Sequence, residues 1–185
     1  MTYTEQLKDE HKGIKLMLRI MDRICDRLLT GEQINPEHLE KIVDFLKVFA
    51  DTCHHAKEEE LLFPAMVRAG IPKEGGPIGV MLAEHSQGRA HVKALGEAVA
   101  DFKAGNSAAS KIIVEHARAY IALLSQHIDK EDTILYPMAD KYIPKPVQVK
   151  LLEEFDTIEK ERIGEGRHEE FHKLLKHLKS LYLDQ

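Results

Sequence analysis

The sequence predicts an all-α protein: an up-down-up-down four-helix bundle followed by two short extra C-terminal helices. Apolar residues recur at helical spacing along the chain, and no stretch alternates long enough to indicate a sheet. Glycine and proline divide the first part into four long segments with short connections, which favours antiparallel neighbours. One segment occurs twice, as HHAKEEELLFP at 54–64 and as HIDKEDTILYP at 127–137, so two of the long helices share a pattern.

The first two helices are predicted over residues 4–29 and 36–69. A capping-box pattern at Thr2 and Glu5 precedes the first helix. Asn35 followed by Pro36 places an N-cap before a proline at the first helical position, which begins the second helix. A glycine follows the end of each helix, and Pro64 predicts a kink in the second.

The remaining helices are predicted over residues 77–104, 107–142, 147–162 and 167–183. The loop GIPKEGGP lies before the third helix, and Gly105 separates the third from the fourth. The breakers IPKPV and GEG set off the last two, shorter helices. We therefore expect residues 1–142 to form the bundle and residues 143–185 to form a helical extension packed on it.

The composition restricts the class of partner. The 185 residues carry 26 Lys and Arg against 31 Asp and Glu, a net charge of −5, which offers no basic footprint for nucleic acid. No apolar run approaches the roughly 20 residues that span a bilayer, and the N-terminus is too polar for a signal peptide. We expect a cytoplasmic protein without a membrane partner, in which Cys25 and Cys53 are buried free thiols.

Histidine is over-represented, with 11 residues, and metal ligation is the commonest cause of such an excess. Each copy of the repeat begins with His-x-x-x-Glu, whose two side chains lie on one face of a helix. Two further histidines lie near the starts of the first and third helices. In an antiparallel bundle these starts lie at the same end as the finishes of the second and fourth helices. The candidate metal ligands at this one level are His11, His54, Glu58, His85, His127 and Glu131.

Four imidazole nitrogens and two carboxylates from four helices suit a pair of iron, manganese or zinc ions. The glutamates would bridge the ions, and the histidines would fill terminal positions. Two glutamates only partly neutralise two divalent ions, which leaves room for a bridging oxo, hydroxo or water, or for a ligand from solution. His55 with Glu59 has the same spacing as His54 with Glu58, and the repeat selects the second pair. Glu59 and Asp132 are then expected to support the ligands or to face solvent.

The other histidines have weaker placements. His91 lies six residues after His85 and does not share its helix face. His168 and His172 form an i, i+4 pair on the last helix, which could cap the mouth of the site; an exposed helix face is the alternative. We include His168 as a further metal ligand or a residue that supports one. The histidines expected to be ordinary surface or core-edge residues are His38, His116 and His177.

The chain resembles the hemerythrin-like HHE cation-binding family in four blocks: DEH at 9–11, HHAKEEELLFP, GGPIGVMLAEHSQGR around His85, and HIDKEDTILYP. The resemblance covers about residues 5–142, and the GEGRHEEFH segment is similar to an extension in some members. It implies a four-helix bundle with a non-heme di-iron centre and the same six ligands. Hemerythrin itself has a second histidine four residues after the one at His85, where this chain has Arg89. One terminal position is therefore expected to be open, or filled by His168, another side chain or water.

This reading implies a protein that binds or senses a small ligand such as dioxygen, nitric oxide or peroxide, or that handles iron. An open position suits peroxide, nitric oxide or sensing better than reversible carriage of oxygen. The alternative is a di-iron enzyme that turns over peroxide or nitric oxide, or that repairs damaged iron centres. A helical interaction module that needs no metal is the remaining hypothesis, and chelation would leave its melting temperature unchanged.

Overall fold

The computed structural model describes residues 1–164 and 166–184, and every regular element in these ranges is a helix. The prediction of an all-α protein is therefore confirmed. The first rod is α1 (Tyr3–Leu29), and the second comprises α2 (Pro36–Phe45), η1 (Leu46–His55), η2 (Lys57–Leu62) and α3 (Phe63–Arg68). The third rod is α4 (Pro77–Lys103), and the fourth comprises α5 (Ala109–Lys130), η3 (Glu131–Leu135) and α6 (Tyr136–Tyr142). The chain continues through α7 (Lys145–Ile158), η4 (Glu159–Ile163) and α8 (Arg167–Tyr182).

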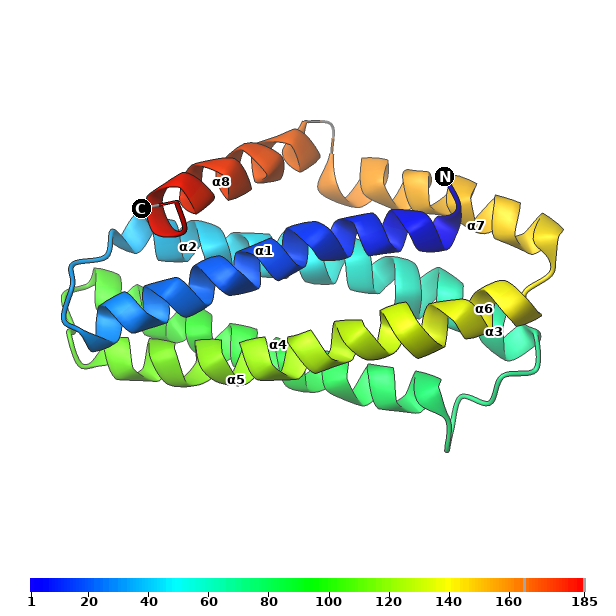
Figure 1. The fold of residues 1–185 in the computed structure, drawn as a ribbon, viewed down its shortest axis with the longest axis horizontal. Coiled ribbons are helices and arrows are strands. Elements are labelled where there is room, and N and C mark those ends of the chain that lie inside the picture. Colours follow the sequence, from blue (N-terminus) through cyan, green and yellow to red (C-terminus); the bar gives the residue numbers. More distant parts are fainter. Residues whose placement is uncertain (165, 185) are drawn as a thin grey trace.

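Figure 1 shows the four rods side by side, with successive rods running in opposite directions. Helix α4 packs against α5 and α2, and α5 packs against α1. Helices α7 and α8 both contact α1 on the outside of the bundle, and α8 also reaches α2. The starts of α1 and α4 consequently lie at the same end as α3 and α6 (Figure 1). In the described residues, no helix combines the length and the apolar character that crossing a membrane requires.

Side-chain caps set the start of the first two rods. The Thr2 hydroxyl accepts a hydrogen bond from the Glu5 N–H, and the Glu5 carboxylate accepts one from the Thr2 N–H. The Asn35 side chain accepts from the Glu37 N–H, directly before the proline that opens α2. These bonds satisfy donors that the first turn of a helix leaves free. They help to fix the register of both rods, and with it the height of the ligands that each rod carries.

Both copies of the repeated segment include π-helical stretches, in which hydrogen bonds span five residues. Helices η1 and η2 carry the first copy, and the second copy runs from the end of α5 through η3. In each copy the π-helix ends where an aromatic residue, Phe63 or Tyr136, begins the next α-helix and a proline follows it. At Pro64, where we predict a kink, the structure shows this change from π- to α-helix. Such π segments frequently mark functional sites.

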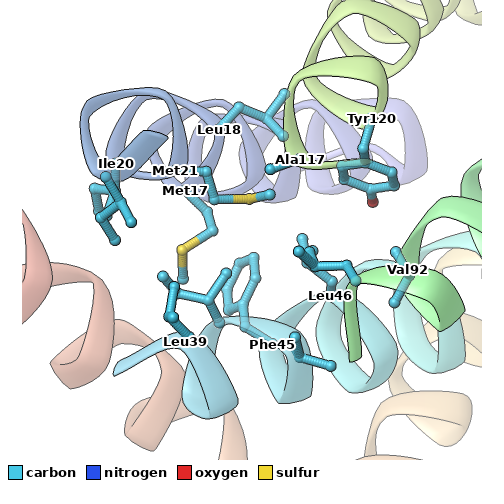
Figure 2. Close-up of a cluster of buried hydrophobic side chains, with 14 of the residues drawn as sticks. Met17, Leu18, Ile20, Met21, Leu39, Phe45, Leu46, Val92, Ala117 and Tyr120 are labelled. Carbon is cyan, nitrogen blue, oxygen red and sulfur yellow. The ribbon is translucent and has the colours of Figure 1, made fainter. Parts of the chain in front are cut away.

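Two apolar clusters lie on either side of the candidate ligands along the bundle. One gathers α1, α2, α4, α5 and α8, and Figure 2 shows Met17 and Met21 of α1 facing Leu39 and Phe45 of α2. The other surrounds Phe155 of α7 at the opposite end. Along each rod the candidate ligands fall between residues of the two clusters. Packed apolar layers above and below them exclude water from the level of the site.

The C-terminal helices contribute to both clusters. Phe155 of α7 is fully buried and meets the Tyr3 ring edge-on, and Phe171 of α8 packs against Phe45 of α2. Helix η4 contacts η1, so the extension covers the rod that carries the first copy of the repeat. The predicted break at 164–166 includes residue 165, which lies outside the described residues. Gly164 and Gly166 on either side have φ values of 85° and 87°, which favour glycine.

Candidate metal centre

The structure brings six of the seven predicted ligands together in the interior. They come from four rods, and all six side chains are buried. Two groups of donor atoms form, one with His11, His54 and Glu131, and one with Glu58, His85 and His127 together with His55. The antiparallel register thus places the ligand atoms at one level, as the spacing along the sequence requires.

The histidines form two close pairs. The Nε2 atoms of His11 and His54 lie 3.0 Å apart, and those of His85 and His127 also lie 3.0 Å apart. Glu131 spans the two pairs, because its Oε2 lies 3.2 Å from His11 Nε2 and its Oε1 lies 2.8 Å from His127 Nε2. This arrangement resembles two adjoining coordination sites with a shared carboxylate.

Glu58 lies between the same pairs. Its Oε2 is 3.4 Å from His85 Nε2 and 3.9 Å from His54 Nε2. This oxygen and both oxygens of Glu131 are buried and accept no hydrogen bond from the described residues. Unpaired buried carboxylate oxygens are costly, and a cation at this position would satisfy them. The donor set of imidazole and carboxylate therefore fits a metal pair.

Each of the four histidines forms a hydrogen bond with a carboxylate through Nδ1, the ring nitrogen that points away from the centre. A histidine ring that hydrogen-bonds through Nδ1 to a carboxylate keeps its Nε2 lone pair free for a metal. The bonds join Nδ1 of His11 to Asp132 at 2.7 Å, His54 to Glu10 at 2.7 Å, His85 to Glu59 at 2.6 Å, and His127 to Glu84 at 2.8 Å. All four Nε2 atoms consequently face the centre.

A basic side chain in turn holds each of these carboxylates. The pairs are Lys15 with Asp132 at 3.1 Å, Lys57 with Glu10 at 2.5 Å, Arg89 with Glu59 at 2.8 Å, and Lys130 with Glu84. Arg89, which stands where a further histidine ligand is expected by resemblance, therefore supports His85 through Glu59. It occupies the same place relative to His85 as Lys15 does relative to His11, four residues on.

The internal repeat thus extends well beyond the ligands. Glu10 precedes His11 as Glu84 precedes His85. The lysine of the first copy, Lys57, binds Glu10, and the lysine of the second copy, Lys130, binds Glu84. Glu59 and Asp132, which follow the two candidate bridging glutamates, hold the histidines of α4 and α1. Equivalent positions in the two halves of the site therefore carry side chains with the same roles.

The buried carboxylates require positive charge at the centre. Burial alone would lower the pKa of His11 and of His85, but neighbouring carboxylates raise these pKa values to about 9 and about 11. Burial would raise the pKa of Glu131, but the histidines around it hold that pKa well below its ordinary value. A metal pair would supply this positive charge, and its binding would release any proton that His11 or His85 carries.

Tyr136 also touches the centre, although it is absent from the predicted ligand set. Its hydroxyl donates to Glu58 Oε1 at 2.7 Å and lies 3.4 Å from His11 Nε2, and its ring stacks on the His11 ring. Phe63, the equivalent residue of the first copy, stacks on His85 without any hydroxyl. In the sequence, the extra hydroxyl is visible as tyrosine in place of phenylalanine at the aromatic position of the second copy.

His55 is a fifth buried imidazole beside the centre. Its Nδ1 lies 3.2 Å from Asp51, and its ring stacks on His85 with centroids 3.8 Å apart. Burial and the neighbouring His85 lower the pKa of His55 to about 3, so the ring is neutral. Ile128 occupies the equivalent position in the second copy, so His55 belongs to one half of the site alone. The internal repeat favours His54 over His55, and the structure places both at the centre.

The structure does not bring His168 to this cluster. Its side chain is 34% exposed, its Nε2 lies 3.9 Å from Glu159, and its ring packs against Phe49. Glu159 of η4 binds Lys57 and lies between His168 and the ligands. Among the described residues, His168 belongs to none of the groups of donor side chains that could hold a metal ion. Four histidines that we expect to lie away from the centre form two pairs instead: His91 contacts His116, and His38 contacts His177.

Cys25 and Cys53 are buried free thiols. Burial raises the pKa of Cys25 to about 11 and that of Cys53 to about 12. Cys53 lies close to Glu10 and Glu159, around the ammonium group of Lys57. Lysine therefore supplies the cation for these two carboxylates.

Comparison with known proteins agrees with this geometry. Three uncharacterized proteins, one from Mycobacterium bovis and two from strains of Mycobacterium tuberculosis, are each 26% identical over 166 residues. The match covers 89% of this chain and 64% of each relative, so the chain spans less than two thirds of their length. No solved structure matches the chain significantly. The family model for the hemerythrin HHE cation binding domain matches residues 2–139, and the chain therefore belongs to the hemerythrin HHE cation-binding family.

Proposed function

We propose that residues 1–142, as an up-down-up-down four-helix bundle, hold two non-heme iron ions and bind or sense dioxygen, nitric oxide or peroxide, or handle iron. The observation that carries this proposal is the pair of facing imidazole sets with unpaired glutamate oxygens between them. His11 and His54 would hold one ion, and His85 and His127 the other. Residues 143–185 would form an extension that supports the first copy of the repeat through Glu159.

The spacing of the histidine nitrogens permits each pair to share an ion. Two nitrogens each about 2.1 Å from a shared ion lie about 3.0 Å apart at right angles and about 3.4 Å apart at the tetrahedral angle. Both observed pairs are 3.0 Å apart. The choice of iron follows from the family resemblance, since manganese and zinc accept the same imidazole and carboxylate donors.

The surroundings favour a small ligand. Apolar clusters lie above and below the centre along the bundle axis, and they disfavour entry of a large polar substrate from either end. Bound iron would supply redox chemistry and open coordination positions for a diatomic molecule or peroxide. The Tyr136 hydroxyl, already beside Glu58 and His11, could hydrogen-bond to such a ligand. The protein's part is to exclude water and to hold these groups in place.

Metal analysis with optical spectroscopy tests the proposal. The purified protein, reconstituted with ferrous iron, should contain about two irons per chain and show an iron charge-transfer band after oxidation. The spectrum should change under nitric oxide or peroxide. Glu131→Gln should lower the iron content because it removes a shared oxygen ligand, while His168→Gln serves as the matched control and should keep both irons.

Chelation separates this proposal from a metal-free interaction module. Metal that binds only the folded state adds about 2.7 kcal/mol at a hundredfold excess over Kd, so removing it should lower the melting temperature. Failure to bind iron, together with an unchanged melting temperature after chelation, would contradict the proposal. Consumption of peroxide or nitric oxide well beyond stoichiometric amounts would assign an enzyme rather than a sensor or carrier.

A further inference from the structure

A cavity of about 250 Å³ lies beside the candidate metal centre, between η1, α4 and α5. Its inner wall includes Leu46, Val92 and Tyr120, and Figure 2 shows the Tyr120 hydroxyl directed toward the other two side chains. Gly88 also lines the wall, and a Cβ atom at this position would be in ordinary van der Waals contact with the Tyr120 ring, at 3.4 Å. Since an apolar cavity of about 150 Å³ already admits benzene, this cavity has room for a substituted ring.

Positive charge surrounds the mouth of the cavity. Lys47, Arg89 and Lys93 line it, and Asp51 is the acidic residue among the lining side chains. Arg89 binds Asp51 at 2.7 Å, which neutralises that carboxylate. Within residues 1–164 and 166–184, neither Lys47 nor Lys93 forms an ion pair. Two uncompensated ammonium groups beside an apolar cavity attract an anion.

Tyr120 places an unused hydrogen-bonding group inside the cavity. The residue is 2% exposed, and its hydroxyl has no hydrogen-bond partner among the described residues. Because solvent in the cavity reaches this oxygen, a polar atom of a ligand can replace water as its hydrogen-bond partner. Burial, with the nearby Asp51 carboxylate, raises the pKa of Tyr120, so the hydroxyl keeps its proton and can donate it.

The floor of the cavity separates it from the metal ligands. His55 lines the cavity, and its ring stacks on the His85 ring with centroids 3.8 Å apart. Glu58 and Glu131 are not among the lining residues. A molecule in the cavity would therefore lie one imidazole ring away from the candidate centre, outside the coordination sites.

We propose that this cavity binds a small organic anion with an apolar body. Its carboxylate lies at the mouth between Lys47 and Lys93, and its body packs against Leu46 and Val92. A polar atom at the far end of the ligand accepts a hydrogen bond from Tyr120. This site is distinct from the metal centre of the proposed function and does not require metal to be bound.

Calorimetric titration of the metal-loaded protein with benzoate and 4-hydroxybenzoate tests the proposal. Both probes should bind, and 4-hydroxybenzoate should bind more tightly. The double variant Lys47→Gln/Lys93→Gln should weaken both by about tenfold or more, as loss of charged hydrogen bonds implies. Lys111→Gln, an exposed lysine on α5 away from the cavity, is the control and should leave both affinities unchanged.

Tyr120→Phe provides the second test, because it removes only an unpartnered hydroxyl. It should weaken 4-hydroxybenzoate several-fold and leave benzoate unaffected. The proposal would be overturned if neither probe binds, or if the double lysine variant binds both probes as tightly as the wild type does. It would also be overturned if neutral benzyl alcohol binds as tightly as benzoate. Competition by inorganic phosphate at similar concentration would also overturn it, since a surface cation pair would suffice. Iron content measured on each variant shows separately whether the metal centre is intact.

Discussion

Lys57 and Lys130 occupy equivalent positions in the repeat but differ in burial, which makes them a matched pair for a test of stability. The Lys57 side chain is 0% exposed and binds Glu10 at 2.5 Å and Glu159 at 3.1 Å. Burial alone would lower the pKa of Lys57, but these two carboxylates raise it. The Lys130 side chain is 36% exposed and binds Glu84. The difference arises because the C-terminal extension, through Glu159, covers one lysine and not the other.

Lys57→Met should destabilise the metal-free protein far more than Lys130→Met. Removing one partner of a buried ion pair leaves the Glu10 carboxylate buried with only the His54 ring as its partner, which costs about 3–5 kcal/mol. At about 2–4 °C per kcal/mol for a chain of this size, the melting temperature should fall by about 6–20 °C. An exposed pair is worth about 0–1 kcal/mol, so Lys130→Met should lower the melting temperature by less than about 4 °C.

Thermal and urea denaturation of chelated protein, followed by circular dichroism at pH 7, measures both values. The double variant Lys57→Met/Glu10→Gln should recover part of the loss, because no unpaired buried charge remains. Equal destabilisation by the two single variants would refute the reasoning, since it would mean that burial by the extension does not matter. A loss below about 1 kcal/mol for Lys57→Met would refute it as well.

Three further outcomes are expected. Burial would raise the pKa of Asp51, but His55 and Arg89 lower this pKa to about 2. The Asp51 carboxylate therefore stabilises the folded state above its unfolded pKa of about 3.9, and this stabilisation is lost as the pH falls toward 2. The stability difference between wild type and Asp51→Asn should therefore be constant near neutral pH and shrink between about pH 4 and pH 2 in urea titrations. Phe155→Ala should cost about 3–5 kcal/mol in the same assay, because it empties a fully buried position between the extension and the bundle. Tyr136→Phe removes the hydrogen bond to Glu58; iron content should be retained while the charge-transfer band shifts, and an identical spectrum would count against contact with the centre.

Much of this arrangement follows from simple periodicities in the sequence. The start of α1 and the start of α2 are set by short-range caps, which depend on neighbours two or three residues apart. The meeting of His11, His54 and Glu131 follows because antiparallel rods with short connections bring residues of similar height together. The all-helical class needs only the helical spacing of apolar residues.

The parts that escaped prediction depend on rotation about the helix axis and on long-range packing. Neither the repeat nor the α-helical period selects His55 or Tyr136; His55 lies in a π-helical stretch, and Tyr136 directly follows one. The place of His168 depends on η4, which puts Glu159 between it and the ligands. No local pattern encodes how a C-terminal helix docks onto a bundle formed about 100 residues earlier.

The π-helical stretches also limit how the length of this protein can change during evolution. A π turn contains one residue more than the α turn that would replace it, so loss of one codon within residues 46–55 could restore regular α-helix. Side chains beyond the deletion would keep nearly the same direction, but those inside the stretch, which include His54 and His55, would be redistributed around the rod. Insertions and deletions are thus expected to be tolerated in the connecting loops, such as residues 69–76, and to be absent from the repeated segments of related chains.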